Sequence, residues 1–450
     1  MKQNKDYLIT EKPSRALLIF SIPMIIGNLF QQAYTIVDSA IVGRYVGETA
    51  LAAVGASYAL TSIFICIAIG GGIGASVIIS HHFGAHNYGR MKTCIRTALL
   101  SFLFISLILG GIGLIFSQQI MEVLNTPADT IDIAVTYLNI YFLGLPFLFM
   151  YNILSSMFNA LGESRIPLYL LIFSSVLNIF LDLYMVAVLN LGVAGAAYAT
   201  FIAQGISAVL SLIIFVVTLQ QLQGKAEGWF SKTEFSDMSR IALPSILQQS
   251  TVSIGMMLVQ SVVNSFGTQI LAGFSAAMRI ESLCVVPMSA IGNAMSSYTA
   301  QNIGAEKEER ISQGYRTGNF MIIIIAVILC LFLEIAHKPL IALFLDNAAS
   351  SQAIVTGESY LKFIGFFFCM IGFKMAVDGI LRGAGAVKVF TIANMVNLTL
   401  RVTIAKFGAP IWGVSMVWYA VPLGWLANFL ISYGYYRTEK WKEAASKTVD

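Results

Sequence analysis

Two aspartates are the residues best placed to do chemistry, because each lies inside a long apolar segment. Asp38 follows Tyr34-Thr-Ile-Val, and Asp182 follows Asn178-Ile-Phe-Leu. An ionisable residue at mid-membrane costs about 2.5–3.5 kcal/mol on insertion scales, so such residues are functional candidates. Asn178 and Asp182 are four residues apart, which places their side chains on one face of a helix.

Neither aspartate has a basic partner deep in the apolar segments of the first half of the chain. Two acids that are desolvated and repel each other favour holding a proton. Alternatively, a hard cation such as Na⁺ lies between them, and Asn178 with the hydroxyl of Thr200 completes an oxygen cage. Either arrangement loads and releases a monovalent cation. The plainer alternative is that the two aspartates only hold two helices together through hydrogen bonds.

The composition shows where such residues must lie. Of 450 residues, 57% are hydrophobic and 11% are charged, against about 25% charged in a typical soluble domain. This excludes a soluble enzyme or a nucleic-acid binder and predicts an all-α membrane protein. Twelve segments are long and apolar enough to span a membrane: 15–42, 49–80, 93–118, 130–158, 166–189, 193–219, 239–265, 269–300, 314–337, 353–381, 388–407 and 412–436.

The distribution of basic residues predicts the orientation. If the N-terminus is cytoplasmic, the cytoplasmic segments hold 20 Lys and Arg and the outer loops hold three. Cytoplasmic loops are enriched in basic residues. We therefore expect a multi-pass protein of the plasma (inner) membrane with both termini in the cytoplasm.

The chain repeats itself around a polar stretch at its midpoint. At an offset of 220 residues, Gly47 corresponds to Gly267 and Arg90 to Arg310, and further on Asn178 corresponds to Asn397. Six spans in each half give parallel repeats. This predicts an N-terminal lobe of residues 1–219, a cytoplasmic linker of 220–238 and a C-terminal lobe of 239–450.

The second half carries different charges. Arg401 takes the place of Asp182, while Lys374 and Asp378 are spaced for a structural ion pair. Arg279 and Glu281 lie two residues apart and point to different faces, so either could shape a cavity. Met256 belongs to a group of methionines, which adapt to varied apolar ligands.

Two further patterns limit the function. No GxxxxGK[ST] nucleotide-binding loop is present, so uphill transport must draw on an ion gradient. His81, His82 and His86 surround one end of the second span, where a solvated loop is favoured over a metal site. We expect no metal beyond possible Na⁺ at the aspartates, no cofactor and no nucleic-acid partner.

The chain resembles the multidrug and toxic compound extrusion (MATE) transporters, especially their prokaryotic branch. The resemblance covers nearly the whole chain and includes Asn159-Ala-Leu-Gly-Glu-Ser-Arg165, and Arg382-Gly-Ala-Gly385 in the second half. Its most specific part is the quartet Asp38, Asn178, Asp182 and Thr200, which matches the cation-binding site of the family's N-terminal lobe.

The resemblance implies a fold and a set of roles. The fold is 12 helices in two pseudo-symmetric lobes with a V-shaped central cavity. The activity is export of amphipathic, often cationic organic compounds in exchange for H⁺ or Na⁺ by alternating access. Helix 1 bends at Pro23. The residues near the cavity in the first lobe are Gln31, Tyr34, Tyr137 and Asn152. Because the repeat is internal, a monomer embedded in lipid suffices for function.

Two alternatives stay open. A lipid-linked oligosaccharide flippase with a related two-lobe fold needs basic residues for a pyrophosphate, and Arg279 and Arg401 are the only deep arginines. A membrane-embedded enzyme needs a compact catalytic set, such as a His/Asp pair in a span. No histidine lies deep inside a predicted span, since His337 is the last residue of the span 314–337, which disfavours an enzyme.

Overall fold

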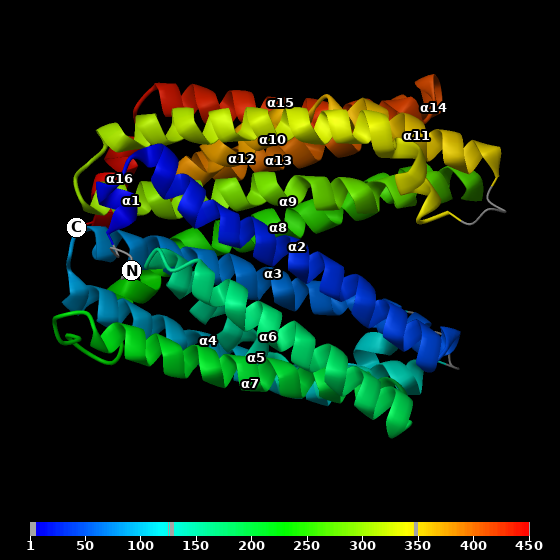
Figure 1. The fold of residues 1–450 in the computed structure, drawn as a ribbon, viewed down its shortest axis with the longest axis horizontal. Coiled ribbons are helices and arrows are strands. Elements are labelled where there is room, and N and C mark those ends of the chain that lie inside the picture. The colour runs from blue at the N-terminus through cyan, green and yellow to red at the C-terminus, as the bar shows by residue number, and fades with distance from the viewer. Residues whose placement is uncertain (1–5, 125, 127–129, 346–349, 450) are drawn as a thin grey trace. The chain divides into compact units, whose positions relative to one another are not determined.

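The regular structure is helical throughout the described part of the chain (Figure 1). The computed structural model describes residues 6–124, 126, 130–345 and 350–449. The first half forms α1 (Tyr7–Thr10), α2 (Pro13–Tyr45), α3 (Glu48–Gly84), α4 (Tyr88–Val123), α5 (Ile131–Ala160), α6 (Arg165–Asp182), the π-helix η1 (Leu183–Val188) and α7 (Gly192–Gln220).

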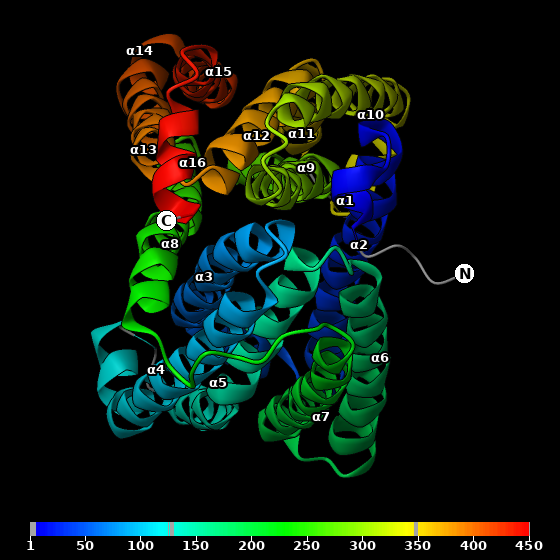
Figure 2. The same ribbon diagram turned by 90° about the vertical axis from the view of Figure 1, so that its left-hand side faces the viewer.

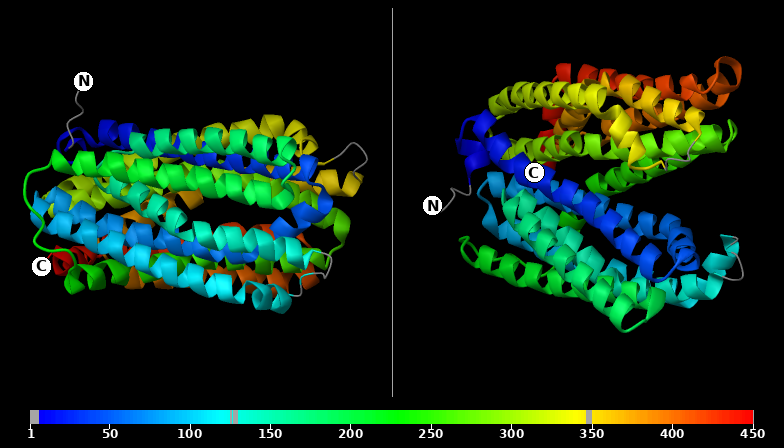
Figure 3. Two further views of the ribbon diagram at one scale, coloured as in Figure 1. Left: turned by 90° about the horizontal axis from the view of Figure 1, so that it is seen from below. Right: turned by 45° about the vertical axis from the view of Figure 1, so that its right-hand side comes forward.

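The second half follows the same plan. It forms α8 (Lys232–Asn264), α9 (Thr268–Gly304), α10 (Glu309–Ala342), α11 (Ser351–Gly365), α12 (Phe368–Gly383), α13 (Val387–Thr403), the π-helix η2 (Ile404–Gly408), α14 (Ala409–Trp412), α15 (Ser415–Arg437) and α16 (Trp441–Val449). Within each half the long helices run side by side (Figure 3).

The number of spans agrees with the sequence prediction. Eleven helices in the described residues are long and apolar enough to cross a membrane, or up to 12 if one bent pair is a single span. That pair is α11 with α12, bent by 53°. It occupies the predicted tenth span, 353–381, which is therefore broken rather than straight.

Contacts group the chain into two units. The C-unit contains Met1–Ile25 with Leu247–Asp450, and the N-unit contains Ile26–Ile246. The predicted lobes follow the sequence repeat, so the two divisions differ at the starts of α2 and α8. Both helices begin in one unit and end in the other. Each contains a proline, Pro23 or Pro244, two residues before the last residue of its first unit.

The N-unit is built around α5. This helix packs against α3, α4 and α7, and Figure 2 shows it end-on between α4 and α7. Its buried residues Leu138, Leu145 and Phe149 form a core with Phe64 of α3 and Met121 of α4. These helices are largely apolar, and close packing between helices is a main force that fixes their order in lipid.

In the C-unit, α9 and α12 cross at very close range. A Cβ atom added at Gly379 would lie 2.2 Å from the carbonyl oxygen of Gly292, and one added at Gly383 would lie 2.4 Å from that of Ser296. Small residues let two helix backbones approach in this way. The crossing therefore depends on glycine.

The predicted repeat is visible in local geometry. Gly47 and Gly267 precede α3 and α9 with φ of 101° and 98°, a conformation that favours glycine. A π-helix begins directly after Asp182, and the second one begins three residues after Arg401. π-helical segments are rare and often lie at functional sites. Both halves thus carry the same irregularity next to a charged residue.

Candidate functional site

The polar quartet predicted from the sequence is brought together in the N-unit. Asp38 comes from α2, Asn178 and Asp182 from α6, and Thr200 from α7. The amide of Asn178 is satisfied on both sides when its Nδ2 lies toward Asp182. In this orientation Nδ2 donates to Oδ2 of Asp182 at 2.8 Å, and Oδ1 accepts from Oγ1 of Thr200 at 3.2 Å. Asn178 therefore connects α6 to α7 and orients one carboxylate oxygen.

The two aspartates are direct neighbours. Asp182 is fully buried, and its other oxygen, Oδ1, has no amide or hydroxyl donor among the described residues. Its carboxyl group lies within electrostatic reach of that of Asp38. Two neighbouring carboxylates repel each other unless a proton binds to one of them or a metal cation lies between them. No Lys, Arg or His of the described chain pairs with either of them.

Two tyrosines complete this site. The hydroxyl of Tyr34 lies 2.8 Å from the Asn178 amide, so it joins α2 to α6. Tyr34 and Tyr137 both lie within electrostatic reach of the two aspartates. This places two of the four residues predicted near the N-terminal cavity beside the quartet.

The other two predicted residues lie differently. Asn152 donates from Nδ2 to the carbonyl of Leu148 in its own helix, at 2.8 Å. Gln31 is exposed on α2, and its carbonyl accepts from the hydroxyl of Thr35. Neither makes a hydrogen bond with the quartet, and their predicted roles stay predictions.

The three cavity residues predicted in the second half have unlike surroundings within the C-unit. Met256 and Arg279 are exposed. Glu281 is buried and accepts from the hydroxyl of Tyr360 at 2.6 Å. Arg401 exerts an electrostatic influence on Glu281, yet its Nε and Nη2 have no hydrogen-bond partner among the described residues. Sequence spacing gave no sign of the Glu281–Tyr360 pair, which joins residues 79 positions apart.

The ion pair predicted in the second half is present. Nζ of Lys374 lies 3.2 Å from Oδ2 of Asp378, and both side chains are buried. Ser432 donates to Oδ1 of Asp378 at 2.7 Å, and Lys374 donates to Asn394 at 3.1 Å. With these partners the pair ties α12 to α13 and α15, as expected for a structural role.

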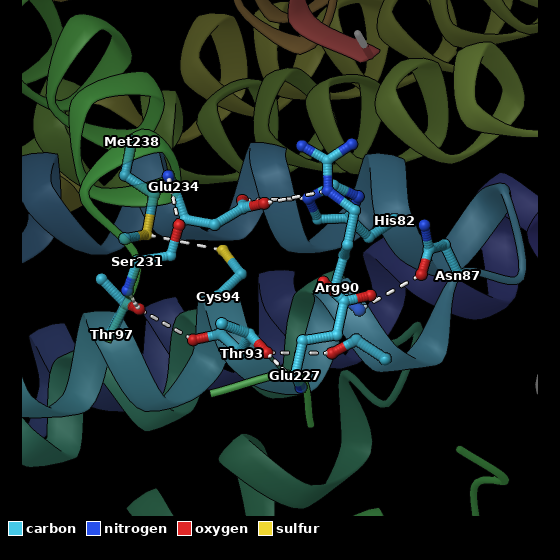
Figure 4. A network of polar contacts seen from close by, with 11 residues as sticks. His82, Asn87, Arg90, Thr93, Cys94, Thr97, Glu227, Ser231, Glu234 and Met238 are labelled. Carbon is cyan, nitrogen blue, oxygen red and sulfur yellow. Dashed lines mark hydrogen bonds and ion pairs between the residues drawn. The ribbon is translucent and has the colours of Figure 1, made fainter. Parts of the chain in front are cut away.

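A second polar network lies at the other end of the N-unit, where α3, α4 and the start of α8 meet (Figure 4). The carboxylate of Glu234 is held by Nε2 of His82 at 3.0 Å and by Nε of Arg90 at 3.3 Å. His81 and His82 are buried. The interpretation as a solvated loop is therefore wrong for His81 and His82, because α3 continues to Gly84 and Glu234 pairs with His82, whereas His86 is exposed beyond the end of α3.

The same network fixes the connection between the halves. The backbone N–H groups of Glu227 and Ser231 donate to the hydroxyls of Thr93 and Thr97, at 2.9 and 3.0 Å. Lys92 donates from Nζ to two carbonyls of the connection, those of Leu222 and Gly224. The predicted linker is thus bound to α4 at residues 222, 224, 227 and 231, and Figure 4 shows the last two of these contacts.

The C-unit holds its own N-terminal segment in a related way. Arg310 and Asn302 correspond to Arg90 and His82 at the offset of 220 residues. Arg310 donates to the carbonyls of Leu8 and Glu11, and Asn302 donates to that of Leu8. Arg310 thus holds the segment that precedes α2, whereas Arg90 pairs with Glu234 in the first turn of α8.

Comparisons with known proteins agree with this architecture. The MatE family model matches residues 23–184 and 244–406. A probable multidrug resistance protein of Bacillus subtilis, YpnP, is 31% identical over 430 residues, covering 95% of this chain and 96% of that protein. A second B. subtilis protein described in the same words, YoeA, is 27% identical and covers 97% of each chain. A MOP superfamily transporter from Pyrococcus furiosus superposes with a TM-score of 0.91 at 23% identity, covering 98% of this chain and 99% of that one.

Proposed function

This chain belongs to the MatE family of membrane transporters, and we propose that it exports amphipathic, often cationic organic compounds in exchange for H⁺ or Na⁺. Family members are transporters rather than enzymes. The observation that carries the proposal is the pair Asp38 and Asp182, two acids within electrostatic reach of each other and with no basic partner in the described chain. Substrates of this chemistry fit relatives described as multidrug resistance proteins.

The geometry supports exchange because the site changes charge when a cation binds. Without a cation, Oδ1 of Asp182 has no amide or hydroxyl donor in the described chain, and the two carboxylates repel each other. A proton or Na⁺ removes both costs and draws α2 toward α6. The bound and empty states therefore favour different positions of α2.

In this scheme α2 transmits the change. Pro23 lies inside α2 and cannot donate a backbone hydrogen bond, so the helix bends there at low cost. Both termini lie in the cytoplasm, as the distribution of basic residues indicates. The last residues at each end, 1–5 and 450, are outside the described structure.

The test uses the purified full chain in liposomes loaded with a fluorescent cationic dye. A gradient of two pH units stores about 2.7 kcal/mol per proton, enough for about a hundredfold dye gradient at one proton per dye. We expect dye movement with a pH gradient or with a Na⁺ gradient. Asp38→Asn and Asp182→Asn should each abolish it.

The matched control is Asp132→Asn, because Asp132 is exposed at the start of α5 and its side chain has no partner role in the site. It should transport normally. Full gradient-driven transport by folded Asp38→Asn protein would overturn the coupling scheme. If wild-type protein moves no dye with either gradient, the export proposal fails and the flippase alternative becomes the next to test, with Arg279 and Arg401 as its basic residues.

A further inference from the structure

A groove of about 470 Å³ runs along one face of α4 in the N-unit and ends against the connection between the halves. Its walls are almost wholly apolar. The residues that matter most are Leu100, Leu103, Phe104 and Leu107 from α4, with Phe230 and Phe235 from the segment around the start of α8. The α4 residues recur at the three- and four-residue spacing of a single helix face.

The far wall of the groove is held in place. Phe230 and Phe235 contact each other with ring centroids 6.0 Å apart. Ser231, the residue after Phe230, donates its backbone N–H to the hydroxyl of Thr97, one turn before the groove begins (Figure 4). The groove is therefore a built feature, whose two walls are joined by hydrogen bonds.

The mouth of the groove is basic. Arg96 is exposed on α4, one turn before Leu100, and its guanidinium lies 4.7 Å from the centre of the Trp229 ring. It donates to one carbonyl, that of Gly228 at 3.5 Å. A guanidinium has five N–H groups, so donors remain for a further acceptor. Arginine suits phosphate, and tryptophan is enriched where a membrane meets water.

The surrounding charges favour an anion. Residues 90–96 and 225–240 hold six basic and three acidic side chains, a net charge of +3. Of the three acids, Glu234 pairs with His82 and Arg90, and Asp237 pairs with Arg240 at 3.6 Å. Glu227 is the exposed acid of this set.

We propose that this groove binds one phospholipid with an anionic headgroup, its phosphate at Arg96 and an acyl chain along Leu100 to Leu107. That stretch of helix is about 10 Å long, which accommodates the first part of an acyl chain. A cationic organic substrate would fit the apolar walls but be repelled at the mouth. The lipid site is thus distinct from the aspartate site and does not depend on the proposed transport activity.

The test is native mass spectrometry of the purified, delipidated full chain titrated with dioleoyl phosphatidylglycerol or dioleoyl phosphatidylcholine. We expect the first phosphatidylglycerol to bind about fivefold more tightly than phosphatidylcholine, the contribution of one basic residue at a membrane surface. Arg96→Gln should remove this preference. Phe230→Ala should weaken the binding of both lipids and leave their ratio unchanged.

The control comes from the repeat. Arg316 corresponds to Arg96 at the offset of 220 residues and is also exposed, on α10. Arg316→Gln should keep the preference for phosphatidylglycerol. Equal loss in both arginine variants, or an unchanged preference in Arg96→Gln, would overturn the assignment. Displacement of bound lipid by a cationic dye in the wild type would overturn it as well. A melting curve in detergent verifies that each variant is folded.

Discussion

Replacing Glu234 with glutamine tests whether the network in Figure 4 holds the connection between the halves. The change keeps the size of the side chain but removes the negative charge that His82 and Arg90 share. The Glu234 side chain is 5% exposed, whereas that of Arg90 is 30% exposed. In the variant, water can therefore replace part of the interaction that Arg90 loses. The side chain of His82 is only 7% exposed, so it is left with the amide as a weaker acceptor.

The size of the effect follows from these contacts. A hydrogen bond to a charged group contributes about 1.5–3 kcal/mol. With two such bonds weakened and one partly hydrated, the attachment of residues 220–236 should lose about 2–4 kcal/mol. Since about 1.4 kcal/mol corresponds to a factor of ten, local opening should become about 30- to 1,000-fold more frequent.

Hydrogen exchange followed by mass spectrometry measures this opening directly. The reporters are the backbone amides of Glu227 and Ser231, which donate to threonine hydroxyls of α4. Local opening sets their exchange rates. Glu122→Gln, at an exposed glutamate near the far end of α4, is the control and should leave them unchanged. Equal protection of these amides in Glu234→Gln and wild type would refute the role given to the buried charge.

Two more substitutions give measurable outcomes. Thr200→Val removes the hydroxyl that donates to the Asn178 amide but leaves the backbone N–H of residue 200 at 3.1 Å from Oδ1 of Asn178. The loss of one neutral hydrogen bond costs about 0.5–1.5 kcal/mol. It should therefore weaken the apparent affinity for the coupling cation, measured by titration of the gradient, about 2- to 12-fold. An unchanged affinity would remove Thr200 from the site. Gly379→Ala forces a methyl group onto the α9 backbone and should cost about 1–3 kcal/mol, lowering the melting temperature in detergent. Gly434→Ala, with no neighbour within 4 Å, should not lower it, and equal shifts in both variants would contradict the close crossing.

The quartet was predictable because its physical signal is local and strong. A charge in an apolar segment is costly wherever the segment packs, and the four-residue spacing of Asn178 and Asp182 fixes their common face. What spacing alone does not supply is the approach of α2 to α6, which joins residues 144 positions apart, as in the contact of Tyr34 with Asn178. The family resemblance provided that step.

The network around Glu234 was not predictable for the opposite reason. His82 and Glu234 are 152 positions apart, and each lies in a polar stretch that is typical of a solvated loop. Only the return of the chain to α3 buries them. Nothing in the sequence around Glu234 shows that this carboxylate is buried against His82. The sequence therefore favours a solvated position for the histidines.

The departures from regular α-helix could not be predicted from the sequence either. The break between α11 and α12 and the two π-helices follow from hydrogen bonds shifted by one residue, and no residue type demands such a shift. The repeat did predict that Arg401 stands where Asp182 stands in the first half. The structure adds that each residue shortly precedes a π-helix, which begins one residue after Asp182 and three residues after Arg401.

The first part of α2 belongs to the C-unit and the first part of α8 belongs to the N-unit, and this arrangement has a consequence for synthesis. Residues up to 25 are translated before residues 247–450, yet they group with them. The carbonyls of Leu8 and Glu11 bond to Arg310, about 300 positions later. The N-unit can gather all its residues once the chain has grown to Ile246. The start of α2 must therefore remain without its packing partners until more than 200 further residues have been translated.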